Sequence, residues 1–136
     1  MTIKPASPVY DVLVIGGGPA GLSTALGLSR QLFTVVVFDR TSQHPAPHMH
    51  NVLTWDHSPA HKFHSAGREE ISDRYKKTIT FRDVPVASAK KLGNGTFELV
   101  DEEGSAFVGK KLVLAQGVTS ITPSIPGYDN LWGKSM

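Results

Sequence analysis

An α/β fold, in which a parallel sheet is joined to a small antiparallel meander, is predicted by three features of this 136-residue sequence. Residues 9–15 form an almost continuous apolar run that ends in a glycine cluster, which is typical of a strand covered on both faces. A stretch with helical periodicity follows, and then a second β-branched run at 34–38. From residue 78 onward, apolar residues recur at every second position, as in strands with one exposed face.

The first half of the chain is predicted to contain a βαβ unit. Residues 19–31 are expected to be helical, with a proline at the first helical position, where its missing N–H is tolerated. The apolar residues near one face of this helix are Leu22, Ala25, Leu26 and Phe33. A strand, a glycine turn, a helix and a second strand place the two strands parallel in one sheet.

A second amphipathic helix is predicted from Ser58, as N-cap, and Pro59, as first helical residue, to about Lys77. Gly67 in its interior costs about 1 kcal/mol relative to alanine. The apolar positions at helical spacing are Phe63, Ala66, Ile71 and Tyr75.

An antiparallel meander is predicted from residue 78, with turns at Asn94-Gly95 and Glu103-Gly104. The alternating pairs are Ile79 and Phe81, Val84 and Val86, Phe97 and Leu99, and Ala106 and Val108. Residues 112–115 return to the pattern of a buried parallel strand, and prolines at 123 and 126 end regular structure.

Composition limits the classes of function. The length suits a single domain over residues 1–136, with a leader at 1–8 and a loop rich in histidine and proline at 41–57. The absence of cysteine excludes a thiol nucleophile, a redox disulphide and a thiolate metal site carried by these residues.

The charged residues, with a net charge of +2, are scattered along the sequence, so no nucleic-acid partner is expected. The apolar runs are strand-sized and no secretory signal is visible, so we expect no membrane partner and a cytoplasmic location.

The glycine cluster carries the main functional signal. It contains G-x-G-x-x-G, which allows a tight turn, a close approach of backbone to a pyrophosphate, and a helix packed closely on the sheet. The candidate residues are Gly16, Gly18, Pro19, Ala20 and Gly21. Asp39 ends the second strand about twenty residues on, where a carboxylate accepts hydrogen bonds from a ribose 2′-hydroxyl. A Rossmann-like dinucleotide site is therefore predicted. Asp39 disfavours a cofactor with a 2′-phosphate, but the adjacent Arg40 could accommodate one, so both kinds of cofactor stay open.

All six histidines fall in one segment, at positions 44, 48, 50, 57, 61 and 64. His61 and His64 are spaced to share one helix face, which raises the possibility of a metal site. We favour polar residues that line a loop or site, and expect no metal, because the cluster holds few carboxylates. Imidazole titrates near neutral pH, so His48, His50 and His57 are candidates for proton transfer.

Four motifs in order resemble the N-terminal part of the FAD domain of thioredoxin-reductase-like flavoproteins. They are VLVIGGGPAG at 12–21, HMHNVLTWDH at 48–57, KLVLAQGV at 111–118 and PSIPGY at 123–128. The resemblance extends from about residue 10 to 134 and is strongest to the fungal branch that includes dithiol oxidases of secondary metabolism.

The resemblance implies an FAD/NAD(P)-binding fold with FAD as cofactor. The pyrophosphate would lie on the glycine loop, the ribose on Asp39, the flavin near His50 and Asn51, and the adenine near Val86. The strand that ends at Ala115, Gln116 and Gly117 would run beneath the cofactor. Gln116 departs from the threonine that is usual in the family. The family's NADPH domain and Cys-x-x-Cys pair follow the stretch that residues 132–135 resemble, so we expect a chain truncated before them.

Three functions remain open on the sequence. The first is an FAD-binding module of a thioredoxin-reductase-like oxidoreductase in fungal secondary metabolism. The second is a small enzyme that acts on a small-molecule substrate without redox chemistry, by isomerisation, dehydration or cyclisation, through its loop histidines. The third is a non-catalytic partner of a full-length paralogue or of a second copy of this chain.

Overall fold

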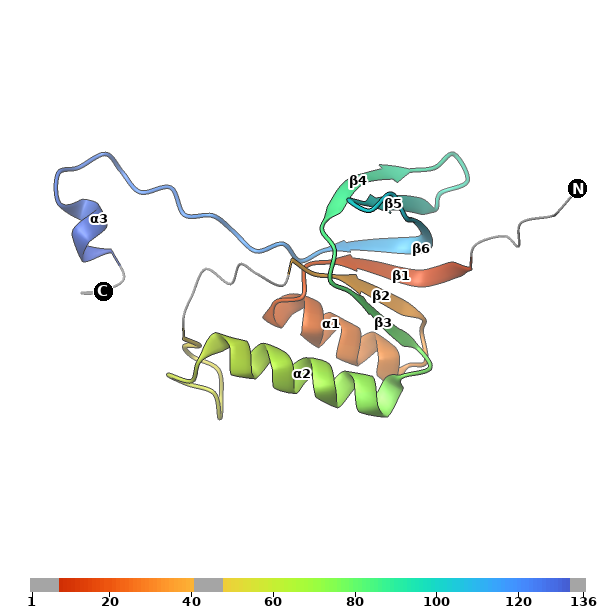
Figure 1. The fold of residues 1–136 in the computed structure, drawn as a ribbon, viewed down its shortest axis with the longest axis horizontal. Coiled ribbons are helices and arrows are strands. Elements are labelled where there is room, and N and C mark those ends of the chain that lie inside the picture. The colour runs from red at the N-terminus through yellow and green to blue at the C-terminus, as the bar shows by residue number, and fades with distance from the viewer. Residues whose placement is uncertain (1–7, 41–47, 133–136) are drawn as a thin grey trace, which may run out of the picture.

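The computed structural model describes residues 8–40 and 48–132 and contains one six-stranded mixed sheet in the order β3-β2-β1-β6-β5-β4 (Figure 1). Its strands are β1 (Val9–Ile15), β2 (Val35–Phe38), β3 (Ile79–Arg82), β4 (Val86–Lys91), β5 (Phe97–Asp101) and β6 (Ala106–Leu114). The helices are α1 (Pro19–Arg30), α2 (Ala60–Tyr75) and the short α3 (Tyr128–Leu131). The predicted α/β class, with a parallel core and an antiparallel meander, is confirmed.

Three layers enclose two apolar cores, because β1 and β2 are covered on both faces. On one face, Val12 and Val14 of β1 pack with Leu22 of α1 and Ile71 of α2. On the other face, Leu13 packs with residues of β2 and β5, among them the fully buried Leu99. Figure 1 shows α1 and α2 beneath the sheet and the β4-β5 hairpin above it. Double coverage explains why the two strands are continuous apolar runs.

The prediction of an antiparallel meander from residue 78 was wrong for its first strand. β3 pairs parallel with β2, from Val35 opposite Ile79 to Phe38 opposite Arg82, with α2 as the crossover. An alternating pattern reports that one face of a strand is exposed, but it carries no information on strand direction. In β3, Ile79 is buried and Thr80 is exposed, which produced the alternation.

The two strands predicted at 106–108 and 112–115 are one strand, β6. Residues 106–109 pair antiparallel with β5, and residues 108–114 pair parallel with β1. Gly109 interrupts the apolar pattern because a Cβ there would lie 2.5 Å from Cγ of Leu13. Lys110 and Lys111, which follow it, are exposed. The interruption in sequence therefore marks close packing inside a strand rather than a turn.

The predicted turns are confirmed, while two helix details are corrected. Gly95 and Gly104 both have positive φ, at 85° and 82°, between paired strands. Helix α2 begins at Ala60 with Pro59 as N-cap, one residue later than predicted, and no side chain caps it. Phe33 lies beyond the end of α1 and is 45% exposed, so it does not belong to the helix face.

Gly67 is explained by helix packing. A Cβ at this position of α2 would lie 3.2 Å from Cδ1 of Leu22 in α1, which is tighter than ordinary contact. The absence of a side chain therefore lets the two helices lie close together on the sheet.

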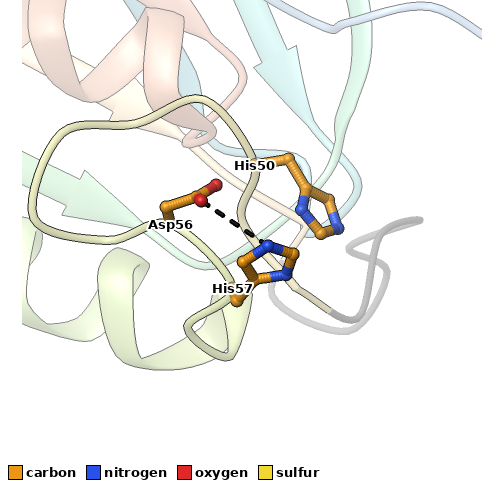
Figure 2. Close-up of side chains that lie close together, drawn as sticks. All are labelled: His50, Asp56 and His57. Carbon is orange, nitrogen blue, oxygen red and sulfur yellow. Dashed lines mark ion pairs between the residues drawn. The ribbon is translucent and has the colours of Figure 1, made fainter.

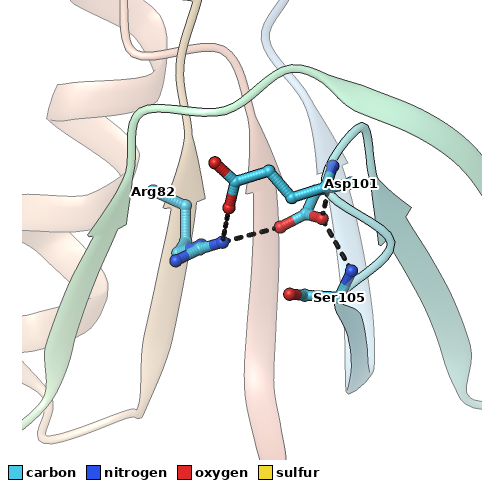
Figure 3. A network of polar contacts seen from close by, with 4 residues as sticks. Arg82, Asp101 and Ser105 are labelled. Carbon is cyan, nitrogen blue, oxygen red and sulfur yellow. Dashed lines mark hydrogen bonds and ion pairs between the residues drawn. The ribbon is translucent and has the colours of Figure 1, made fainter.

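A polar network joins β3 to the turn between β5 and β6 (Figure 3). Arg82 Nη2 donates to Asp101 Oδ2 at 2.8 Å and to Glu103 Oε2 at 3.2 Å. The other oxygen of Asp101 accepts from the backbone N–H groups of Ser105, at 2.8 Å, and Glu103, at 3.1 Å. The Arg82 guanidinium holds the pKa of the Asp101 carboxyl below its ordinary value. The network fixes the meander above the parallel sheet.

Asp11 of β1 makes a similar junction with β6 and with the residue that precedes β2. Its carboxylate accepts from Lys110 Nζ at 2.7 Å, and from the backbone N–H and hydroxyl of Thr34, both at 2.9 Å. The hydrogen bond from Lys110, followed by those from Thr34, lowers the pKa of Asp11 to about 2.

Among the described residues, no helix combines the length and apolar character that crossing a bilayer requires.

We expect Asp11→Asn to lower the free energy of unfolding at neutral pH. We also expect that free energy to fall less steeply in acid than it does in the wild type. The pKa of Asp11 is lowered on folding from 3.8 to about 2, so its stabilising effect is complete above about pH 4 and is lost as pH falls toward 2. Urea unfolding followed by circular dichroism between pH 2 and 7 measures both effects. Asp73→Asn, which alters an exposed carboxylate on α2, is the control. If the free energy of unfolding falls as steeply from pH 4 to 2 in Asp11→Asn as in the wild type, the stabilising role of the Asp11 carboxylate is contradicted.

Candidate functional site

A large pocket of about 1640 Å3 opens at the carboxyl ends of β1, β2 and β6. Its walls come from the glycine loop after β1, the end of β2, the loop at 48–50, the start of β4, and residues 114–120. Ligands of open α/β sheets bind at the carboxyl ends of the strands, where the connections diverge. The position of the pocket therefore identifies it as the candidate site.

Two glycines of the loop are required by close backbone contacts. Gly16 has a φ of 111°, and a Cβ there would overlap the carbonyl group of Ala115 at the end of β6. A Cβ on Gly21, in the first turn of α1, would overlap the carbonyl oxygen of Gly16. Gly16 lets the loop pass the end of β6, and Gly21 lets the start of α1 lie against the loop, so a larger residue at either position has to shift the backbone.

Gly18 has a different role. A Cβ at this position would meet no protein atom within 4 Å, and its φ of −74° is open to any residue. Gly18 is the N-cap of α1, no side chain caps this end, and the first turn carries no acid. The N–H groups and positive dipole end of a helix attract phosphate. The space beside Gly18 is therefore suited to a pyrophosphate rather than to a protein side chain.

Asp39 faces this loop from the end of β2. It is 9% exposed, and its Oδ1 accepts a hydrogen bond from the backbone N–H of Gly17 at 3.2 Å. A Cβ on Gly17 would overlap the Asp39 carboxylate. Gly17 therefore lets the acid approach the loop, and the carboxylate keeps lone pairs for ribose hydroxyls.

Arg68 of α2 is a site residue that the sequence analysis missed. Its Nη1 lies 2.7 Å from Asp83 Oδ1 and 3.8 Å from Asp39 Oδ2, and its guanidinium lies over the ring of Phe81 at 4.6 Å. Arg68 therefore binds Asp83 closely and forms a longer ion pair with Oδ2 of Asp39, whose Oδ1 accepts from Gly17. A signal was available, because Arg68 follows His64 by four residues on the buried face of the helix, where a charged residue is unusual.

Most of the predicted site residues line the pocket. They are Gly16, Gly18, Pro19, Ala20, Asp39, Arg40, His48, His50, Val86, Ala115, Gln116 and Gly117. Three others do not line it: Gly21, which lies in the first turn of α1, and Asn51 and His57, which are both exposed. Met49 and His64, both buried, line the pocket and were not predicted as site residues.

The histidine segment is described from residue 48 onward, and His44 lies outside the described residues. His48 forms an isolated bridge with Pro59 at the start of α2, which brings the loop back to the helix. This contact places His48 and His50 at the pocket, opposite the glycine loop. The pocket therefore has a region suited to phosphate and ribose and a second region that carries imidazoles.

The sequence matches the family model described as pyridine nucleotide-disulphide oxidoreductase over residues 10–136. It is 46% identical to "Thioredoxin reductase aclD" of Aspergillus oryzae, over 96% of this chain and 42% of the relative. It is 43% identical to "Thioredoxin reductase tcpT" of Claviceps purpurea, over 96% of this chain and 41% of the relative.

Among solved structures, an oxidoreductase from Agrobacterium tumefaciens superimposes with a TM-score of 0.79 at 32% identity, over 93% of this chain and 43% of the other. The chain thus spans about two-fifths of the length of the curated relatives that it matches.

Proposed function

Because the chain belongs to the pyridine nucleotide-disulphide oxidoreductase family, we propose that it binds FAD in the pocket at the carboxyl ends of β1, β2 and β6. Members of this family bind FAD. The observation that carries the proposal is the open space at Gly18, beside an uncapped helix N-terminus and opposite the carboxylate of Asp39. These features match the two recognition elements of an adenosine diphosphate group.

Each part of the pocket has a proposed role. Residues 16–21 hold the pyrophosphate, and Asp39 accepts from the hydroxyls of the adenosine ribose. Val86, at the start of β4, contacts the adenine, and residues 115–117 support the cofactor from below. His50 lies toward the flavin, whereas Asn51 does not line the pocket. When bound, FAD supplies two-electron redox chemistry at its isoalloxazine ring, while the protein binds and orients it.

The acid at residue 39 supports a cofactor without a 2′-phosphate, because two negative charges would otherwise meet. Arg40 lines the same pocket but is exposed, whereas Asp39 is held by both Gly17 and Arg68. FAD has a free 2′-hydroxyl on its adenosine ribose and satisfies this condition.

The proposal concerns cofactor binding in a thioredoxin-reductase-like oxidoreductase, with a role in fungal secondary metabolism. None of the 136 residues is a cysteine, so we assign no thiol–disulphide step to them.

A non-redox use of the same pocket is the second candidate. It is supported by His48 and His50, which line the pocket and offer imidazole nitrogens that can accept or donate a proton. His57, the third predicted catalytic residue, does not line the pocket. The FAD titration described next separates the two functions, because this alternative requires a pocket that takes up no flavin.

We expect Gly18→Ala to weaken FAD binding without affecting the fold. The new methyl group enters space that no protein atom occupies, so it obstructs the pyrophosphate rather than the backbone. Displacing one N–H···phosphate hydrogen bond costs about 1.5–3 kcal/mol, which is at least about tenfold in Kd. Quenching of flavin fluorescence during titration measures Kd, and circular dichroism confirms folding.

Gly27→Ala is the matched control, because a Cβ at this exposed position of the same helix also meets nothing within 4 Å. It is expected to leave Kd unchanged and to raise helix stability by about 1 kcal/mol. A wild-type protein that takes up no FAD, or equal affinities in the wild type and Gly18→Ala, contradicts the proposal.

We expect Arg68→Gln to weaken the binding of both FAD and ADP by about two- to tenfold, the equivalent of ~0.5–1.4 kcal/mol. The substitution removes the guanidinium that lies 3.8 Å from Asp39 Oδ2, so the carboxylate is less firmly held for the ribose. ADP lacks the flavin and therefore reports on the adenosine region alone.

Arg74→Gln, which removes an exposed pair with Glu70 on the same helix, is the control. Calorimetric titration gives the affinities. A positioning role for Arg68 is excluded if both variants bind like the wild type or lose affinity equally.

Association with another protein chain is a further proposal, and it does not exclude cofactor binding. Large apolar side chains are exposed along residues 114–132, with Val118 91% and Ile121 95% exposed. Apolar surface of this kind is commonly covered by a partner, here a second copy of the chain or a full-length paralogue.

We expect a concentration-dependent dimer in size-exclusion chromatography with light scattering. Association should weaken in Val118→Ser/Ile121→Ser, because these changes remove the two most exposed large apolar side chains of that segment. Lys90→Ser, an exposed change on β4, is the control. A monomer at all concentrations contradicts self-association.

A further inference from the structure

Three potential metal-binding side chains converge beside the pocket. His50, Asp56 and His57 each offer one ligand atom, and these atoms lie within 4.8 Å of one another (Figure 2). The imidazoles of His50 and His57 meet edge to face, with ring centroids 5.0 Å apart. His57 Nε2 lies 3.6 Å from Asp56 Oδ2. The function proposed above uses neither Asp56 nor His57.

Backbone pairing of the loop produces this convergence. The N–H of Met49 donates to the carbonyl of Ser58 at 2.7 Å, and the N–H of His57 donates to the carbonyl of Met49 at 2.8 Å. The two ends of the loop are therefore adjacent, which brings His50 beside His57. The backbone N–H of Asn51 donates to Asp56 Oδ1 at 3.0 Å and holds the carboxylate toward the same side.

The loop keeps this shape at a conformational cost. Asn51, Thr54 and His57 have φ values of 58°, 69° and 57°, in the left-handed region that residues other than glycine seldom adopt. Such conformations are unfavourable for residues other than glycine, and they recur at ligand clamps and active sites. The loop backbone thus presents the three side chains in a defined arrangement.

The chemistry of the ligands points to a borderline divalent transition metal. Imidazole suits zinc, copper, iron and nickel, whereas magnesium and calcium prefer sets of oxygen ligands. Two histidines and one carboxylate leave further coordination positions for water or another ligand. We propose that His50, Asp56 and His57 form a binding site for a zinc-class divalent cation at the edge of the pocket.

The three ligand atoms can bind one metal ion if their side chains move slightly closer together. Two ligands of one zinc ion lie at most about 4.2 Å apart, which is twice the metal–ligand distance, and about 3.4 Å apart in a tetrahedral site. The spread of 4.8 Å therefore has to contract by roughly 1 Å. The side chains of His57 and Asp56 are 80% and 57% exposed, so they can rotate and an ion can reach them.

The proposal differs from the expectation of no metal in the sequence analysis. That expectation considered His61 and His64, which share a helix, and found few carboxylates nearby. His64 is buried at the pocket and His61 is exposed on α2, so neither belongs to the cluster. The pairing of residues 49 and 57 creates the cluster, and sequence spacing does not reveal it.

The test is a titration of the full, untagged 136-residue chain with Zn2+ in competition with a chromophoric chelator, with Mg2+ as a comparison cation. We expect one Zn2+ per chain, no response to Mg2+, and a rise in Tm with Zn2+. His50→Ala, Asp56→Asn and His57→Gly should each weaken Zn2+ binding by at least about tenfold. Removing a group that only hydrogen-bonds to a metal ligand already costs about tenfold in metal affinity, and removing the ligand itself costs more. Glycine at residue 57 keeps the left-handed backbone while it removes the imidazole.

His61→Ala is the matched control, because it removes an exposed histidine a few residues away and leaves the cluster intact. Circular dichroism establishes that each variant is folded, and Co2+ absorption gives a second readout of coordination by nitrogen and oxygen. Three results overturn the proposal: no Zn2+ binding by the wild type, retention of binding in His50→Ala/His57→Gly, or an equal loss in His61→Ala. The titration uses no flavin, so its outcome is independent of whether the pocket binds FAD.

Discussion

The close approach of backbone at the start of α1 is the contact on which the rest of the structure depends. Gly16 passes the end of β6 without room for a side chain, and Gly21 rests on the carbonyl of Gly16. These contacts set α1 against the sheet, and they place the N-terminus of the helix at the carboxyl ends of the parallel strands. The same geometry admits Asp39 beside Gly17 and leaves free space beside Gly18. One packing constraint thus produces both the stability of the βαβ unit and its binding pocket.

The meander contributes to the pocket as well as to the core. Leu99 of β5 covers the second face of the parallel sheet, and the ion pair between the buried Asp101 and the half-buried Arg82 fixes the meander to β3. The N–H of Glu102 donates to the carbonyl of Pro85 at 3.0 Å, so the turn after β5 also holds the entry to β4. Pro85 and Val86 line the pocket. A wall of the candidate site therefore depends on contacts between segments that are distant in sequence.

The loop at 48–58 links the two proposals made for this chain. Its first residues face the pocket, where the family relationship supports a flavin, and its last residues bring Asp56 and His57 against His50. His50 belongs to both groups, so it occupies the boundary between a cofactor pocket and a candidate cation site. The loop keeps this position because its ends are paired through Met49, which is buried against the protein.

The sequence by itself determined the features that depend on local chemistry. The glycine pattern, the proline at the start of α1 and the acid that ends β2 identified the βαβ unit and the pocket residues at 16, 18, 19, 20 and 39, because each of these roles is set by neighbours in the chain. Tertiary structure alone decided the direction of β3, the continuity of β6 through Gly109, the ion pair between Arg68 and Asp39, and the meeting of His50 with His57. Periodicity predicts which face of a segment is buried, but not which other segment packs against it. Each of these four features depends on which segments lie together in the folded chain.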